Sequence, residues 1–177
     1  KDNFCENGSD TYITPENYDF KNPDDFGGFY TYDEMLVELD EMYNLYPNLI
    51  TSRSDIKDPF NNDNPHTHQT FEGRFLQWVK ISDNPTIYEN EPQILYTSLH
   101  HAREPASMQQ LIYFMWYLLE NYDTNDLVKS IINESELFFV PCVNPDGYVF
   151  NEEIEPNGGG MWRKNKRDGH GVDNNRN

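Results

Sequence analysis

Hydrophobic and polar positions along the chain follow two periods, one typical of helices and one typical of strands. Apolar residues recur at helical spacing after Thr31-Tyr32-Asp33-Glu34, which has the form of a capping box, and Pro47 ends this pattern. A second helix is predicted to begin at Pro105, and a shorter one to cover roughly residues 125–132. Apolar runs and alternating stretches predict four strands, at residues 48–54, 75–81, 94–99 and 137–143.

The order of these elements predicts the fold class. Strands that alternate with helices form an α/β sheet with helices packed on its faces. The run at residues 94–99 is almost continuously apolar, as expected for a buried central strand. Residues 1–28 lack any such periodicity and are rich in Asn, Asp, Gly and Pro. They are predicted to form an irregular acidic arm or linker that leads into one domain over residues 29–177.

Composition and charge narrow the possible function classes. The 177 residues include 15% aromatic side chains, which is enough packing material for one domain with a hydrophobic core. With 31 acidic against 13 basic residues the net charge is −18, which disfavours nucleic acid and anionic membrane surfaces as partners. The longest apolar run, Leu111–Leu119, is far shorter than the roughly 20 residues of a membrane-spanning helix. The sequence therefore predicts neither nucleic-acid binding nor membrane insertion.

Positive charge is concentrated at one end of this acidic chain. The last 17 residues carry two acidic side chains and five basic ones, namely Arg163, Lys164, Lys166, Arg167 and Arg176. Such a patch is typical of a place that receives an anionic group. The charge pattern alone also fits a solvated loop that balances its own carboxylates, and it favours that simpler interpretation.

His101 and Glu104 are candidate metal ligands, because they follow an apolar strand and stand at the start of the next helix. Open α/β sheets bind their ligands at this edge. Catalytic zinc sites use His and Glu side chains and leave one position for water. His100 and His101 cannot both point the same way from an extended backbone, and the spacing alone does not choose between them. A His-x-x-Glu string is also common in proteins that bind no metal there.

Four stretches, in this order, carry a resemblance to a known family: Leu99-His100-His101-Ala102-Arg103-Glu104, Val143-Asn144-Pro145-Asp146-Gly147-Tyr148, Met161-Trp162-Arg163-Lys164 and Gly171-Val172-Asp173-Asn174-Asn175-Arg176-Asn177. Over residues 29–177 the chain resembles the zinc metallocarboxypeptidases, the family of carboxypeptidases A, B and T. The resemblance implies an α/β fold whose mixed, mainly parallel sheet is flanked by helices. It also implies hydrolysis of C-terminal residues from peptides or proteins, with one catalytic Zn²⁺ as cofactor.

The resemblance also implies roles for the residues around the metal. His101 and Glu104 match the first two zinc ligands, which leaves His100 as a structural neighbour. Arg163 matches the residue that polarises the scissile carbonyl and stabilises the oxyanion, so it is the expected catalytic side chain.

Three further positions match family residues that bind the substrate. Arg103 matches an arginine that contacts the peptide on the non-primed side, although a surface arginine could also pair with a nearby carboxylate. Asn175 and Arg176 match the pair that grips the C-terminal carboxylate, a role that suits a planar and permanently charged guanidinium. The expected partner is therefore the C-terminus of a peptide or protein.

In the family, the third zinc ligand and the Glu that acts as general base lie beyond the position of Asn177. We therefore expect the N-terminal part of a catalytic domain, truncated on its C-terminal side, with the missing half as its partner and no activity of its own. That half would supply further strands, which predicts an uncovered flank at residues 137–143. Two alternatives stay open: a peptidase for cell-wall or modified peptides, and a non-catalytic binding or assembly module.

The remaining candidates have structural interpretations. Asn144-Pro145-Asp146-Gly147 is predicted to form a turn that shapes the approach to the site. His66 and His68 lie in a polar loop and are expected to face solvent. Cys142 is expected to behave as a small buried hydrophobe, and its pairing with Cys5 stays open. The resemblance implies a secreted or otherwise extracytoplasmic protein, since members of this family are commonly secreted, and the two cysteines fit such a location.

Overall fold

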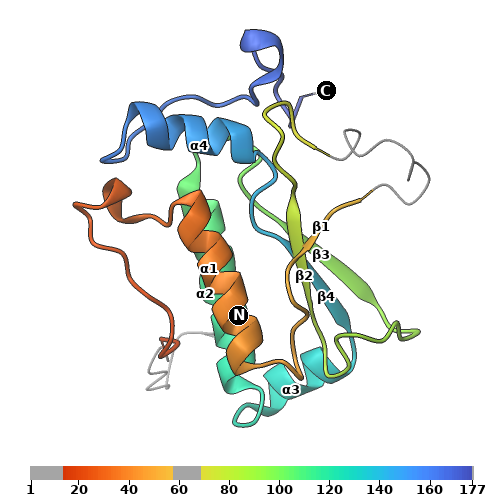
Figure 1. Ribbon diagram of the computed structural model, residues 1–177. Coiled ribbons are helices and arrows are strands. Elements are labelled where there is room, and N and C mark those ends of the chain that lie inside the picture. The colour runs from red at the N-terminus through yellow and green to blue at the C-terminus, as the bar shows by residue number, and fades with distance from the viewer. Residues whose placement is uncertain (1–13, 58–68, 177) are drawn as a thin grey trace, which may run out of the picture.

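Figure 1 shows the computed structural model, which describes residues 14–57 and 69–176. In this part of the chain a four-stranded sheet packs against helices, so the predicted α/β class is confirmed. The helices are α1 (Tyr32–Leu45), α2 (Pro105–Asn121), α3 (Asp126–Asn133) and α4 (Pro145–Ile154), and the strands are β1 (Ser54–Asp55), β2 (Gln77–Ile81), β3 (Gln93–Thr97) and β4 (Glu136–Val140). Within the described residues, every helix is too short or too polar to cross a membrane.

Helix α1 begins with the capping box that the sequence predicts. The Thr31 hydroxyl accepts a hydrogen bond from the Glu34 amide, and the Glu34 carboxylate accepts one from the Thr31 amide. Each side chain thus satisfies a backbone donor that the first turn of a helix leaves unpaired. The apolar positions that follow place one face of the helix in the core, through Met35, Leu39 and Met42.

The strand order is β1-β2-β4-β3, and the connections explain which pairs are parallel. β3 and β4 are parallel, with Ile94 opposite Leu137 and Thr97 opposite Val140. β2 pairs antiparallel with β4, and β1 pairs antiparallel with β2. The sheet is therefore mixed, as the resemblance implies, but only one of its described pairs is parallel. Parallel pairing needs a long crossover, and α2 and α3 form one between β3 and β4.

The sequence predicts a buried central strand at residues 94–99, and this prediction is wrong for the described part of the chain. β3 lies at the edge of the sheet, where Ile94 and Leu95 are 40% and 65% exposed. β4 takes a central place between β2 and β3, so the uncovered flank belongs to β3 and not to residues 137–143. An apolar run shows that a strand suits a buried environment, but it carries no information about which neighbours are present.

The predicted strand at residues 48–54 is wrong over most of its length. Residues 47–49 form a turn, as is typical of Pro and Asn, and Ile50 makes only an isolated bridge to β2. The Thr51 amide donates to the Lys80 carbonyl before regular pairing begins in β1. The segment therefore runs along β2 with intermittent hydrogen bonds, because the turn delays its entry into the sheet.

The hydrophobic core lies between the sheet and helices α1 and α2, which lie side by side across one face in Figure 1. The Trp116 indole of α2 donates to the Glu38 carboxylate of α1, so the polar group buried at this contact is satisfied. From β2 and β4 the fully buried side chains that pack against these helices are Val79, Ile81, Leu137 and Phe139.

Residues outside the regular helices and strands also belong to the core. Tyr18 and Phe26 of the N-terminal arm are both buried, although the described part of the arm contains no regular element besides a 3₁₀ turn at Phe26–Gly28. Cys142 is buried as expected and forms no disulfide with a described residue. The predictions for Cys5, His66 and His68 fall outside the described residues.

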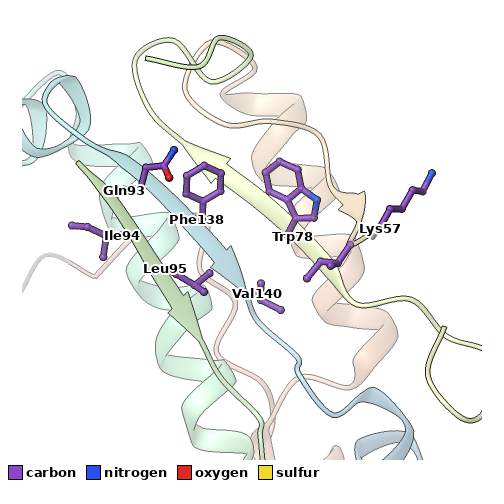
Figure 2. Close-up of a pocket in the computed structure, with 8 residues that line it drawn as sticks. Lys57, Trp78, Gln93, Ile94, Leu95, Phe138 and Val140 are labelled. Carbon is purple, nitrogen blue, oxygen red and sulfur yellow. The ribbon is translucent and has the colours of Figure 1, made fainter. Parts of the chain in front are cut away.

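The opposite face of the sheet is open within the described chain. Figure 2 shows Trp78, Leu95, Phe138 and Val140 along this face, where they line a groove of about 650 Å³. The rings of Trp78 and Phe138 pack with centroids 5.8 Å apart. Helices α1 and α2 lie on the other side of the sheet, so no helix of residues 14–57 and 69–176 covers this apolar face.

Candidate metal centre

The chain leaves β3 through a turn that carries His101 and Glu104 to the start of α2. Leu99 has a φ of 50°, in the left-handed region, and this redirects the backbone out of the strand. Pro105 then opens α2, where a residue without an amide hydrogen is tolerated. Glu104 occupies the N-cap position but makes no capping hydrogen bond with its side chain, which leaves the carboxylate available to face His101.

His101 and Glu104 point at a common position. His101 Nδ1 lies 2.9 Å from Glu104 Oε1, and the side chains are 7% and 55% exposed, respectively. A buried imidazole and a solvent-facing carboxylate thus each direct one potential metal-ligating atom toward the other. Because histidine nitrogen and carboxylate oxygen are both zinc ligands, this arrangement fits two positions of a zinc site.

Asp173 lies on the other side of the His101 ring. Its Oδ1 is 3.1 Å from His101 Nε2, and its Oδ2 forms an ion pair of 2.5 Å with Arg163 Nη1. Desolvation acts to raise the pKa of Asp173, but hydrogen bonds from the Asn175 amide and His101, together with the charge of Arg163, lower it below its ordinary value. A charged Asp173 that accepts from Nε2–H leaves the Nδ1 lone pair to a metal, the tautomer that a ligand needs.

Buried asparagines hold together the segments that carry these side chains. The Asn151 side-chain amide of α4 donates to the carbonyls of Ala102 at 3.0 Å and Trp162 at 2.9 Å, and its oxygen accepts from the Trp162 amide. The Ala102 amide donates to the Arg163 carbonyl, which also accepts from the Asn144 side chain. The turn after β3 is therefore fixed beside the segment that carries Arg163.

The predicted turn Asn144-Pro145-Asp146-Gly147 instead begins helix α4. Asn144 is the N-cap residue, and its side-chain oxygen accepts from the Gly147 amide at 3.1 Å. Pro145 occupies the first helical turn, as it does in many helices. The prediction failed because Asn and Pro favour turns and helix starts through the same local hydrogen bonding and the same fixed φ.

A closed loop brings Arg163 and Asp173 together. The Asn165 side-chain oxygen accepts from the Val172 backbone amide at 2.7 Å. The Asn165 backbone amide donates to the Val172 carbonyl at 3.0 Å. Gly171 has a φ of 67°, and a Cβ at this position would lie only 2.3 Å from the Asn165 carbonyl oxygen. The loop thus returns the chain on itself, so that Asp173 faces the guanidinium of Arg163.

Within the described residues, the three residues expected to bind substrate form no hydrogen bond or ion pair with the side chains of His101 and Glu104. Arg103 is exposed, forms no ion pair within the described residues, and lines a cleft of about 400 Å³ together with Glu104. Asn175 and Arg176 directly follow Asp173 and are also exposed. The Arg176 guanidinium donates to the Asn175 carbonyl at 2.7 Å, and its amide donates to the Asp173 carbonyl.

A complete zinc site needs a third protein ligand. Within residues 14–57 and 69–176, Asp83, Glu89 and Glu91 are the one group of three His, Cys, Asp or Glu side chains that are spaced to hold an ion. That group does not include His101 or Glu104. The His101–Glu104 pair therefore fits a zinc ion as two ligands of a site, and the described residues do not complete it.

Asp173 and Asn151 are the site residues that the sequence analysis missed. Asp173 stands in the last of the four family stretches. An acidic residue within a basic segment favours an ion pair, and this pattern could have identified Asp173. Asn151 carries no comparable signal, because its partners at Ala102 and Trp162 are far apart in the sequence. Its importance follows only from burial and from its three hydrogen bonds.

Comparison with known proteins agrees with this geometry. The family model described as zinc carboxypeptidase matches residues 60–177. A zinc carboxypeptidase of Saccharothrix mutabilis subsp. capreolus is 30% identical over 158 residues, which cover 88% of this chain and 33% of that protein. The inactive metallocarboxypeptidase ECM14 of Paracoccidioides brasiliensis is 31% identical over 103 residues, which cover 56% of this chain and 16% of that protein.

The same fold is present in a solved structure of carboxypeptidase A from Helicoverpa armigera, with a TM-score of 0.62 and 25% identity. The match covers 83% of this chain and 31% of that one. Fold and sequence thus agree on the class, a metallopeptidase fold of the α/β type. The chain belongs to the zinc carboxypeptidase family. It spans about a third of the length of the first relatives that it matches.

Proposed function

We propose that the protein containing this chain is a zinc-dependent metallocarboxypeptidase that hydrolyses C-terminal residues from peptides or proteins. The observation that carries this proposal is the approach of His101 Nδ1 to Glu104 Oε1 at 2.9 Å, with Asp173 behind the imidazole. A carboxylate that accepts from the second nitrogen of a ligating imidazole is typical of zinc sites. Membership of the zinc carboxypeptidase family supports the same reaction.

His101 and Glu104 are the proposed zinc ligands of this chain. A zinc ion held there would act as a Lewis acid and lower the pKa of a bound water. Asp173 would fix the orientation and tautomer of His101 by accepting from Nε2–H, since its Oδ1 lies 3.1 Å from Nε2 and its Oδ2 is paired with Arg163. The imidazole is thus positioned before any ligand arrives, which limits the reorganisation that binding requires.

Arg163 is the proposed catalytic arginine. Its side chain is 31% exposed and pairs with Asp173 through Nη1, so its other N–H groups can donate to the oxygen of a scissile carbonyl. Negative charge develops on that oxygen during hydrolysis, and a fixed cationic donor stabilises it most strongly in the transition state. The backbone contact between Arg163 and Ala102 keeps this donor beside the proposed ligands.

Arg103, Asn175 and Arg176 are proposed to bind the substrate. The Arg176 guanidinium contacts only a neutral carbonyl in the described structure, and a substrate carboxylate would be a stronger partner for it. Recognition of the free carboxylate would restrict cleavage to the last residue of a peptide. Arg103 lines the cleft beside Glu104, where it could contact the peptide backbone on the other side of the scissile bond.

A non-catalytic binding or assembly module is the second candidate function. It is favoured by the match to a relative whose name describes it as inactive. The close approach of His101 and Glu104 and the ion pair behind them favour the peptidase instead. We also propose that residues 1–177 alone are inactive, because two ligands hold zinc too weakly for catalysis. A secreted or extracytoplasmic location remains a proposal that rests on the family.

The test is hydrolysis, by the full-length protein, of a peptide with a free C-terminus and of its C-terminally amidated form. We expect release of single residues from the free form, at least about tenfold slower cleavage of the amide, and loss of activity on chelation that Zn²⁺ restores. His101→Ala should abolish this activity, whereas the control His170→Ala changes an exposed loop residue and should retain it.

Three results would contradict the peptidase proposal: cleavage that is independent of zinc, equal rates on both peptides, and full activity of His101→Ala. A protein that binds zinc but cleaves neither peptide would favour the non-catalytic module. Activity of residues 1–177 alone would refute only the proposal that these residues are inactive by themselves.

A further inference from the structure

A cleft of about 400 Å³ lies beside the proposed ligand Glu104, and we refer to it as the arm cleft. Three segments that are far apart in the sequence line it. The N-terminal arm contributes Phe29, the start of α2 contributes Arg103 and Pro105, and the loop after α4 contributes Met161. Ligand sites in proteins typically measure about 300–1,000 Å³, so this cleft is large enough to receive a bulky side chain.

One wall of the arm cleft is preformed, because the arm and the loop after α4 touch backbone to backbone (Figure 1). Gly158 has a φ of 89°, and a Cβ at this position would lie 2.7 Å from the Gly27 amide nitrogen and 2.8 Å from the Phe26 carbonyl carbon. The buried Phe26 ring packs edge-on against the Tyr148 ring of α4, with centroids 5.6 Å apart. The arm is thus seated on α4 and its loop.

The arm is also anchored along its length. The Glu120 carboxylate of α2 accepts from the backbone amides of Glu16 at 2.6 Å and of Asn17 at 2.8 Å. Further along, the Tyr30 hydroxyl donates to the Asp19 carbonyl at 2.7 Å. These hydrogen bonds hold the arm against the helices, so that it presents its lining residues to the cleft when no ligand is bound.

The lining of the arm cleft is mostly apolar, which is informative in so acidic a chain. Of the residues that line it, only Arg103 and Glu104 carry charge. Phe29 is half-buried, and Met161 is 68% exposed. Methionine suits surfaces that bind varied apolar groups, because its thioether is flexible and polarisable. A cleft for a basic side chain would present carboxylates besides the proposed metal ligand, so this lining favours an apolar occupant.

The position of the cleft relative to His101 indicates which part of a substrate would enter it. Glu104 lies beside Nδ1 of the imidazole, whereas Asp173, three residues before Arg176, lies beside Nε2. A peptide whose C-terminal carboxylate binds at Arg176 would therefore pass the proposed metal centre and continue toward Glu104. The arm cleft lies on this path, where the residues that precede the scissile bond would run.

We propose that the arm cleft binds a bulky apolar side chain that precedes the scissile bond, and that Phe29 and Met161 determine this preference. The proposal rests on the proposed peptidase function, and it narrows the substrates to peptides with such a residue near the C-terminus. Contact with Phe29, Pro105 and Met161 removes the apolar surface of this side chain from water. The exposed guanidinium of Arg103 can donate to a backbone carbonyl of the same peptide.

The test is hydrolysis, by the full-length protein, of peptides that share their C-terminal residue and carry Leu, Ser or Lys at each of the three preceding positions in turn. We expect about tenfold higher kcat/KM for Leu than for Ser at one of these positions. Met161→Glu adds a carboxylate at the cleft, so kcat/KM for Lys relative to Leu should rise about tenfold there. The matched control is Leu127→Glu, because Leu127 of α3 is 69% exposed and lies outside the cleft.

The outcomes separate this proposal from the peptidase function. Cleavage at equal rates for Leu and Ser at all three positions would overturn the cleft proposal and leave the peptidase standing. An unchanged Lys-to-Leu ratio in Met161→Glu would do the same. If no peptide is cleaved, the peptidase function fails, and binding of the same peptides, measured by fluorescence anisotropy, decides on the cleft. Tighter binding of a Leu peptide, weakened by Met161→Glu, would support it, and equal binding of Leu and Ser peptides would overturn it.

Discussion

Partly buried carboxylates lie at both ends of the sheet, but their oxygens have different partners. At the end near α4, Asp173 contacts the Asn175 amide, the His101 ring and the Arg163 guanidinium. At the other end, Glu89 and Glu91 each bury an oxygen that has no partner within the described chain. A carboxylate that is fully satisfied by its own protein is suited to hold another side chain in place. One whose oxygens lack donors favours its protonated form, and the pKa of Glu91 is accordingly raised, first by desolvation and then by the charges of Glu89, Asp83 and Glu136.

The largest effect is expected from the buried ion pair between Lys80 of β2 and Glu136 of β4. Lys80 and Glu136 have side chains that are 6% and 0% exposed, with Nζ 2.6 Å from Oε1. Lys80→Met would leave the buried Glu136 carboxylate without its cation, so we expect the free energy of unfolding to fall by about 3–5 kcal/mol. Denaturant titration measures this change. The control Arg53→Met breaks the exposed pair with Asp40 and should cost less than about 1 kcal/mol. Equal losses would show that burial does not distinguish the pairs.

Asn151→Ala tests the hydrogen bonds that hold the proposed site together. The variant removes three bonds to Ala102 and Trp162 and leaves buried backbone groups unpaired. We expect the free energy of unfolding to fall by about 1–3 kcal/mol. We also expect weaker zinc binding, because the turn that carries His101 loses its support. Asn157→Ala, at an exposed position after the same helix, should change neither quantity. A variant as stable as the wild type would contradict this role for Asn151.

Asp173→Asn tests whether the charge behind His101 matters. The asparagine keeps the shape of the side chain but loses the charge that pairs with Arg163 and His101. We expect zinc affinity to fall about 10–100-fold, measured by competition with a chelator. Asp168→Asn is the control in the same loop, because Asp168 is exposed and only weakly paired. An unchanged affinity in Asp173→Asn would mean that this carboxylate does not support the metal site.

The smallest effect concerns Glu152 of α4, whose carboxylate accepts from the Tyr32 amide at 2.7 Å. Burial raises the pKa of Glu152 to about 7, above its ordinary value of 4.5. The folded protein then holds this proton more tightly than the unfolded chain, so the contribution of Glu152 to stability falls as pH rises from 4.5 to about 7.

Glu152→Gln keeps the acceptor for Tyr32 but removes the titration. We expect the variant to gain about 1 kcal/mol over the wild type at about pH 8 and nothing near pH 4.5, after allowance for solvent screening of a partly exposed group. Denaturant unfolding at the two pH values measures the gain. The control Glu153→Gln, at the adjacent exposed position, should show no such difference. A gain that does not change with pH would contradict the assignment.

Two signals that join residues three positions apart predicted local structure correctly. The capping box at Thr31 and Glu34 joins residues three apart, and both of its hydrogen bonds form. His101 and Glu104 are also three positions apart, and in the structure His101 Nδ1 lies 2.9 Å from Glu104 Oε1. Signals of this range depend on a single turn of backbone, so the remainder of the fold changes them little.

Features that depend on distant partners could not be predicted in the same way. The edge position of β3 depends on where β4 pairs, and an apolar run such as Ile94-Leu95 does not encode this. The ion pair between Arg163 and Asp173 depends on a loop whose closure requires Gly171. The buried ion pair between Lys80 and Glu136 joins residues that are 56 positions apart, so no local pattern marks it.

The most direct test of the central claim is anomalous X-ray diffraction at the zinc absorption edge from crystals of the full-length protein grown with Zn²⁺. The account predicts one strong peak within bonding distance of His101 Nδ1 and a Glu104 carboxylate oxygen, with Asp173 still hydrogen-bonded to Nε2. A peak on Nε2 in place of Asp173, or zinc bound only at other residues, would contradict the account.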